Sequence, residues 1–94
     1  MDITVYNKKI QELSERFIKN DKPSSKYLFH VSNKFFRGAF DVDLAIEAQR
    51  ERVARVIQSF EGTDTQISLI RFGSVERLSV MEHGVINWNV VPNE

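Results

Sequence analysis

The chain has 94 residues, of which 41% are apolar and 28% are charged, and its 13 basic residues balance its 13 acidic ones. A chain of this length can build one modest hydrophobic core, so we expect residues 1–94 to form a single domain. The lack of cysteine excludes disulfides and thiolate metal sites, and no apolar stretch is long enough to span a bilayer.

The charge is unevenly spread along the chain. Residues 1–40 carry eight basic and four acidic residues, a net charge of +4, whereas residues 41–94 carry five and nine, a net charge of −4. This polarity can orient a partner or favour self-association. The first residues show no basic region followed by an apolar run, so we expect a cytoplasmic protein without a membrane partner.

The N-terminal segment is predicted to be an amphipathic helix over residues 3–19. Its apolar residues recur at steps of three and four, which aligns them along one narrow stripe: Ile3, Tyr6, Ile10, Leu13 and Phe17. Polar residues occupy the opposite side, and the segment Asn20-Asp21-Lys22-Pro23 ends the pattern.

Residues 27–31 are predicted to be a strand, because aromatic and β-branched side chains alternate there. Tyr27, Phe29 and Val31 share one face of it. Two interpretations of residues 33–40 stay open. They either pair back on the first strand as a hairpin, or form a loop whose phenylalanines pack under the next helix.

The clearest helical pattern covers residues 42–61. Asp41 is the expected cap, Asp43 lies in the expected first turn, and Gly62 is the expected terminator. The apolar positions at helical spacing predict one broad face toward the core: Val42, Ala45, Ile46, Val53, Val56, Ile57 and Phe60.

Three strands are predicted at the end of the chain, over residues 65–72, 75–82 and 85–91. The pairs Gly73-Ser74 and His83-Gly84 suit tight antiparallel connections. The predicted fold class is therefore α+β with two layers. The helix over residues 42–61 packs on an antiparallel sheet of four or five strands, and the N-terminal amphipathic helix is added to it.

Residues suited to catalysis or metal binding are few. His30 and His83 lie in separate predicted elements, and no third partner accompanies either of them. Asp41 and Asp43 could hold a divalent cation only with further oxygen ligands, and the start of a helix explains both. We expect no catalytic residue, no metal site and no cofactor.

Two features favour a protein partner. Leu44 falls off the predicted core stripe of its helix, and the N-terminal helix has an apolar seam as narrow as that of a coiled coil. The competing explanation is that the chain covers both itself, with the N-terminal helix packed on the domain and Leu44 in contact with the preceding loop. The expected function is that of a small non-enzymatic protein-binding domain, an inhibitor or adaptor that occludes a partner's surface. Leu44, Phe35 and Phe36 are its candidate contacts, and self-association is compatible with it.

The alternative is nucleic-acid or nucleotide binding through residues 22–40. This segment interleaves aromatic rings with basic residues and has no acidic residue; its basic residues are Lys22, Lys26, Lys34 and Arg37. Rings and cations together can stack bases and contact phosphates. The competing structural explanation is that the rings form core and the cations solvate a strand edge. Exposure of Phe35 and Phe36 would mark a contact surface.

Overall fold

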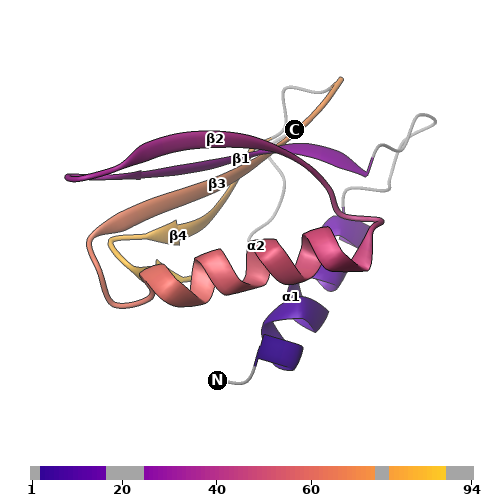
Figure 1. The fold of residues 1–94 in the computed structure, drawn as a ribbon, viewed down its shortest axis with the longest axis horizontal. Helices are drawn as coiled ribbons and strands as arrows, with labels where there is room; N and C mark the ends of the chain where they lie inside the picture. The colour runs from indigo at the N-terminus through magenta and orange to yellow at the C-terminus, as the bar shows by residue number, and fades with distance from the viewer. Residues whose placement is uncertain (1–2, 17–24, 74–76, 89–94) are drawn as a thin grey trace.

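A computed structural model describes residues 3–16, 25–73 and 77–88 of the chain. Its helices and strands follow one another in the order α1, β1, β2, α2, β3, β4, β5. The strands form one antiparallel sheet with the spatial order β2-β1-β3-β4-β5, and both helices lie on the same side of it (Figure 1). The predicted α+β class, the five strands and the additional N-terminal helix are confirmed.

Helix α1 (Ile3–Arg16) places its apolar stripe in the core. Tyr6, Ile10 and Leu13 are fully buried, as the spacing predicts. The predicted end of this helix at residues 17–19, Phe17 included, lies outside the described residues. The Tyr6 hydroxyl donates a hydrogen bond to the Glu61 carboxylate at the end of α2, which ties the two helices together.

Strands β1 (Lys26–Asn33) and β2 (Arg37–Asp43) form an antiparallel hairpin, which decides between the two interpretations of residues 33–40. Tyr27, Phe29 and Val31 point from β1 into the core, as predicted. The register pairs Lys26 with Asp43 and Ser32 with Arg37. Strand β2 is the outermost strand of the sheet on this side.

Helix α2 (Glu47–Phe60) begins five residues later than the predicted start at residue 42. The predicted helical roles of Asp41 and Asp43 are wrong, because both residues lie in β2 and pair with β1. The Asp43 carboxylate instead accepts the backbone N–H of Ala45 at 3.0 Å and so shapes the turn before the helix. The helix starts after Ile46, which makes no side-chain capping bond.

The core face of α2 is also shorter than predicted. Val53, Ala54 and Ile57 are buried, and Val56 and Phe60 pack against the core in part. Val42 enters the core from β2 rather than from a helix. Ala45 and Ile46, expected in the core, are exposed because they belong to the turn.

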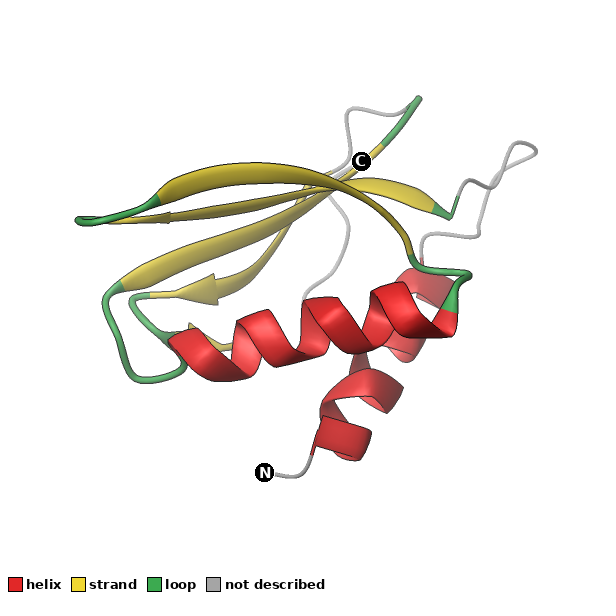
Figure 2. Cartoon of the chain, viewed as in Figure 1, coloured by secondary structure: helices red, strands yellow, loops and turns green. Residues whose placement is uncertain are grey.

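Strands β3 (Thr65–Arg71), β4 (Arg77–Glu82) and β5 (Val85–Ile86) form the predicted antiparallel meander (Figure 2). The last strand is shorter than predicted, because only two of its residues pair with β4. Trp88 lies beyond it and packs its ring edge-on against Tyr6, with centroids 5.5 Å apart. Residues 74–76 and 89–91 of the predicted strands and turn lie outside the described residues.

The two faces of the sheet differ in chemistry. One face packs its apolar side chains against α1 and α2, and the described residues place no helix over the other (Figure 1). Alternation along the strands puts His30, Ser32 and Gln66 on the open face. No helix in the described part of the chain is long and apolar enough to cross a membrane.

Candidate protein-binding surface

The loop between β1 and β2, residues 34–36, forms a hairpin tip that Asn33 holds in place. The Asn33 side-chain oxygen accepts the backbone N–H groups of Phe35 and Phe36, both at 2.8 Å. The Asn33 backbone N–H donates to the Phe36 carbonyl at 2.8 Å and closes the hairpin. An asparagine side chain that binds the backbone two and three residues later is a turn-forming element, so the tip has a defined shape.

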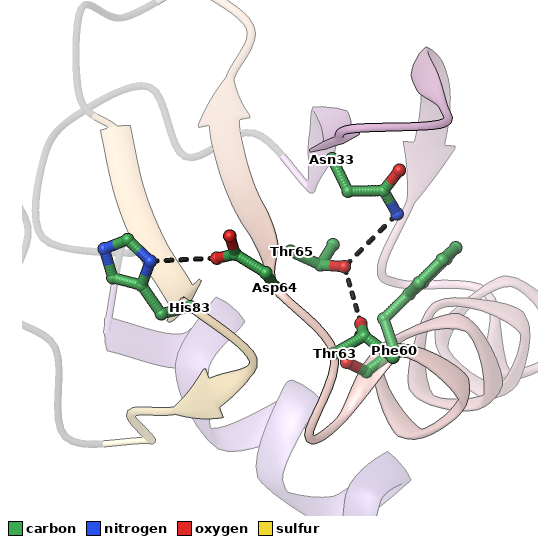
Figure 3. Close-up of polar contacts among 6 residues, drawn as sticks. All are labelled: Asn33, Phe60, Thr63, Asp64, Thr65 and His83. Carbon is green, nitrogen blue, oxygen red and sulfur yellow. Dashed lines mark hydrogen bonds and ion pairs between the residues drawn. The ribbon is translucent and has the colours of Figure 1, made fainter.

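A chain of hydrogen bonds joins Asn33 to the loop between α2 and β3 (Figure 3). The Asn33 side-chain N–H group donates to Thr65 Oγ1 at 3.2 Å. Thr63 Oγ1 donates its only hydrogen to the Phe60 carbonyl at 2.6 Å, so it accepts from Thr65 Oγ1 at 2.7 Å. The donor and the acceptor of each of these three hydrogen bonds are thereby assigned. Because the bonds all run in one direction, they polarise one another.

Three phenylalanines near the tip are accessible to solvent. Phe35 is 89% exposed, Phe36 is 43% exposed and Phe40 on β2 is 38% exposed. The Phe36 ring stacks on Phe60 of α2, with ring centroids 6.4 Å apart and planes inclined by 20°. Phe36 and Phe40 thus lie on the side of the sheet that faces α2.

An apolar groove separates the hairpin tip from the end of α2. It has a volume of about 400 Å³ and is lined by residues 33–36 on one side and by residues 60 and 63–65 on the other. The Asn33–Thr65 bond joins the two walls. The groove is thus a preformed concavity beside an exposed ring.

Basic side chains flank the rings. The Lys34 ammonium lies 5.7 Å from the centroid of the Phe35 ring, and the Arg52 guanidinium lies 5.9 Å from that of Phe40. Cations over aromatic faces at such distances are attracted by about 0.5–1 kcal/mol at exposed sites. Arg37, also exposed, follows the tip directly. The accessible rings are therefore bordered by positive charge.

Leu44, a candidate partner contact, does not belong to this surface, because its own chain covers it. It is 2% exposed and packs in the hydrophobic core. The turn at residues 44–46 breaks the helical geometry on which the expectation depended. The Arg50 guanidinium donates to the Leu44 carbonyl at 2.8 Å and holds this turn. Of the three candidate partner contacts, the structure brings together only Phe35 and Phe36.

The four basic residues of the alternative interpretation are spread out. Lys34 and Arg37 lie at or beside the tip, whereas Lys26 begins β1 at its other end, about 20–25 Å away along the strand. Lys22 lies outside the described residues. Tyr27 and Phe29 are buried, which leaves Phe35, Phe36 and Phe40 as the accessible aromatic rings of the segment.

The histidines and aspartates are not brought together. His30 lies in the middle of β1, opposite Ala39 and Ser68. His83 lies in the β4–β5 turn, where its Nδ1 is 2.9 Å from Asp64, and both side chains face solvent (Figure 3). Asp41 and Asp43 lie in β2 at the opposite edge of the sheet. Among the described residues no three His, Cys, Asp or Glu side chains are grouped as metal ligands would be.

Sequence reasoning missed the residues that build the tip. Asn33, Thr63 and Thr65 join the tip to the rest of the fold, and Phe60 adds its ring. A sequence signal existed for Asn33, since an asparagine directly after a strand is a common turn former. The link between Asn33 and Thr65 gave no such signal, because these two residues are 32 positions apart in the sequence.

Comparisons with known proteins offer no family. No family model, no curated protein and no solved structure matches the chain. Its function has to be argued from its own residues.

Proposed function

We propose that this chain is a non-enzymatic protein-binding domain, an inhibitor or adaptor that acts by covering a surface of a partner protein. The observation that carries the proposal is the position of Phe35. Its ring is 89% exposed on a tip that four hydrogen bonds of Asn33 hold in place. Burial of a phenylalanine side chain is worth about 1.5–3 kcal/mol, so this ring stabilises any complex that covers it.

The tip is suited to recognition because it is already ordered. Binding normally costs about 0.5–1.5 kcal/mol for each flexible side chain that becomes immobilised, and loop ordering adds to this cost. The bonds from Asn33 and the stacking of Phe36 on Phe60 order the tip before binding, so less conformational entropy is lost when a partner binds. Aromatic anchors of this kind dominate the energy of many protein interfaces.

The charges around the tip indicate the chemistry of the partner. Lys34 and Arg37 are exposed beside Phe35, and Asp64 lies across the groove. A complementary surface has an apolar pocket that accepts the Phe35 ring and carboxylates that face Lys34 and Arg37. The expected partner is therefore a protein with an acidic rim around an apolar pocket.

A pair of surface variants tests this proposal. Phe35→Ser removes the exposed ring at the tip, and Val85→Ser removes an apolar side chain that is 70% exposed in β5, at the opposite edge of the sheet. Proteins retained from the native lysate by the wild type and by Val85→Ser, but not by Phe35→Ser, are tip partners. Their affinity is then measured by calorimetry with purified protein, and we expect a loss of at least tenfold, about 1.4 kcal/mol, for Phe35→Ser. Equal retention by both variants would contradict the proposal.

Nucleic-acid binding is the second candidate, favoured by the exposure of Lys34, Phe35 and Arg37 at one tip. A ring that stacks on a base, with two cations near phosphates, is a common element of single-strand binding. Fluorescence anisotropy with a single-stranded oligonucleotide at about 50 mM salt tests it, since contacts to phosphates make binding fall steeply with salt. Undetectable binding, or binding that Lys34→Glu and Arg37→Glu leave unchanged, would remove this candidate.

A further inference from the structure

Strand β2 presents a free edge whose hydrogen-bonding pattern can be read from its pairing with β1. Asn33 N–H bonds the Phe36 carbonyl at one end of the ladder, and Leu44 N–H bonds the Ser25 carbonyl at the other, both at 2.8 Å. Since bonded residues alternate along an antiparallel strand, Gly38, Phe40 and Val42 bond to β1.

The intervening residues of β2 direct their backbone groups away from β1. These are Arg37, Ala39, Asp41 and Asp43. Gln49 of α2 takes the last of them, because its side-chain oxygen accepts the Asp43 N–H at 2.6 Å. The described residues place no strand on the far side of Arg37, Ala39 and Asp41. The strand contains no proline and no lysine, and an edge on which the described residues place no further strand is a template for another strand.

The side chains of β2 complement those of a second copy of the strand that runs antiparallel to it. In an antiparallel pair centred on Ala39, Arg37 of each copy lies opposite Asp41 of the other, and Ala39 lies opposite Ala39. This register aligns the free backbone groups as well, because residues 37, 39 and 41 all point toward the new strand. Opposite charges directly across a pair of strands stabilise it, and like charges destabilise it.

The other face of the strand is aromatic. In this register Gly38 of each copy lies opposite Phe40 of the other. The rings of Phe36 and Phe40 already reach over Gly38, where an added Cβ would lie 2.7 Å from Phe36 and 3.0 Å from Phe40. A twofold axis perpendicular to the sheet keeps α2 of both copies on the same side. The partly exposed rings of Phe36 and Phe40 from both copies then meet and bury one another.

We propose that a second copy of this chain pairs with β2 in this register and joins the two sheets into one continuous sheet. The pairing adds about six main-chain hydrogen bonds, two ion pairs between Arg37 and Asp41, and burial of the rings of Phe36 and Phe40. This inference goes beyond the proposed binding of a partner, because Phe35 lies outside the paired strands and stays exposed in the dimer.

Charge reversal tests the register. Arg37→Asp places carboxylates opposite one another at both ends of the pair, and Asp41→Arg places guanidinium groups opposite one another. Sedimentation velocity is expected to show a dimer for the wild type and at least a tenfold weaker dimer for each variant. An equimolar mixture of the two variants restores opposite charges at every position, so it is expected to form a heterodimer as tightly as the wild type self-associates. The doubly substituted chain is expected to form a homodimer again.

Ala39→Pro supplies a second test that leaves the charges unchanged. It removes the N–H group at the centre of the pairing, and proline is tolerated at an outward-facing position of an edge strand. We expect a monomer with an unchanged circular dichroism spectrum. A wild type that is monomeric at about 1 mM, where even a millimolar dissociation constant yields dimer, overturns the proposal. A dimer that is indifferent to charge reversal, or variants that do not complement each other, overturn it as well.

Partner binding at the hairpin tip and pairing through β2 can be tested independently of each other. Phe35→Ser is expected to lose the protein partner and keep the dimer, and Asp41→Arg, at the far end of β2 from the tip, is expected to lose the dimer and keep the partner. A dimer that is lost with Phe35→Ser and kept with Asp41→Arg would assign self-association to the hairpin tip and overturn the pairing of β2.

Discussion

The Asn33 side-chain N–H group donates a hydrogen bond of 3.2 Å to Thr65 Oγ1, which joins the hairpin tip to the first residue of β3. Thr65 is fully buried, so its hydroxyl relies on Asn33 and Thr63 for its bonds. An unsatisfied buried hydroxyl costs about 1–3 kcal/mol. The residue that shapes the hairpin tip therefore also contributes to the stability of the fold.

We expect Asn33→Ala to lower the free energy of unfolding by about 1–3 kcal/mol, since it releases the tip and removes a partner of Thr65. Thr65→Val is the matched control, because it removes the link to β3 and keeps the bonds from Asn33 to Phe35 and Phe36. Urea unfolding measures both effects. Partner binding is expected to weaken with Asn33→Ala more than with Thr65→Val. The reverse order would show that Asn33 does not shape the tip.

The beginning of α2 shows why part of the fold could not be predicted from sequence. Val42, Ala45 and Ile46 continue the helical spacing of Val53 and Ile57, and this pattern extends the predicted helix to residue 42. Val42 and Leu44 also fit the two-residue alternation of a strand, and both are buried in the structure. The pairing of β2 with β1 decides between these patterns, and pairing is a contact between segments that neither pattern contains.

The exposure of the rings at the hairpin tip could not be predicted from the sequence for a related reason. Phe29, Phe35 and Phe36 are chemically alike, yet Phe29 is buried and Phe35 is 89% exposed. The difference depends on the three-residue tip, which reaches beyond the sheet and the end of α2. The element types, the antiparallel meander and the buried stripe of α1 were predictable because each arises from a local repeat in the sequence.

Tyr6 gives a prediction about alkaline pH. Burial of the ring, the hydrogen bond to Glu61 and the negative charge of Glu61 raise the pKa of Tyr6 from 10 to about 12. Between these values the unfolded chain loses the phenolic proton and the folded chain keeps it, so stability falls as pH rises. The loss is up to about 1.4 kcal/mol per pH unit and ends above the folded pKa. Tyr6→Phe has no such proton, so its unfolding free energy is expected to fall less over this range. If the free energy of unfolding fell equally with pH in the wild type and in Tyr6→Phe, the prediction would be contradicted.

Asp43 gives the corresponding prediction at acid pH. A side-chain hydrogen bond from Ser25, the backbone N–H of Ala45 and the charge of Lys26 lower the pKa of Asp43. Stability from this carboxylate is present above the unfolded pKa of about 3.9 and is lost as pH falls through the folded pKa. Asp43→Asn is therefore expected to be less stable than the wild type at pH 7, with a difference that shrinks in acid. Asp41→Asn, in the same strand, is the control. It is measured in dilute solution, so that the proposed pairing through β2 does not contribute to its stability. A constant difference for Asp43→Asn down to about pH 2 would contradict the assignment.

The turn between β4 and β5 gives a prediction about packing. Gly84 has φ +74°, and its N–H and carbonyl groups bond to Thr65 and Gly62 at 3.1 and 2.9 Å. An added Cβ would lie 1.9 Å from the Thr63 carbonyl oxygen, so Gly84→Ala must displace the loop that carries Thr63 and Thr65. We expect a loss of more than about 3 kcal/mol in the free energy of unfolding.

Gly73→Ala separates this clash from backbone strain. Gly73 has φ +78°, but an added Cβ there meets nothing within 4 Å. Its substitution is expected to cost only the left-handed penalty of about 1–2 kcal/mol. Because the loop displaced by Gly84→Ala forms one wall of the groove, that variant is also expected to weaken partner binding at the tip, which Gly73→Ala leaves unchanged. Equal losses of stability in the two variants would show that Thr63 yields to the added methyl group and that the groove wall is not held by this turn.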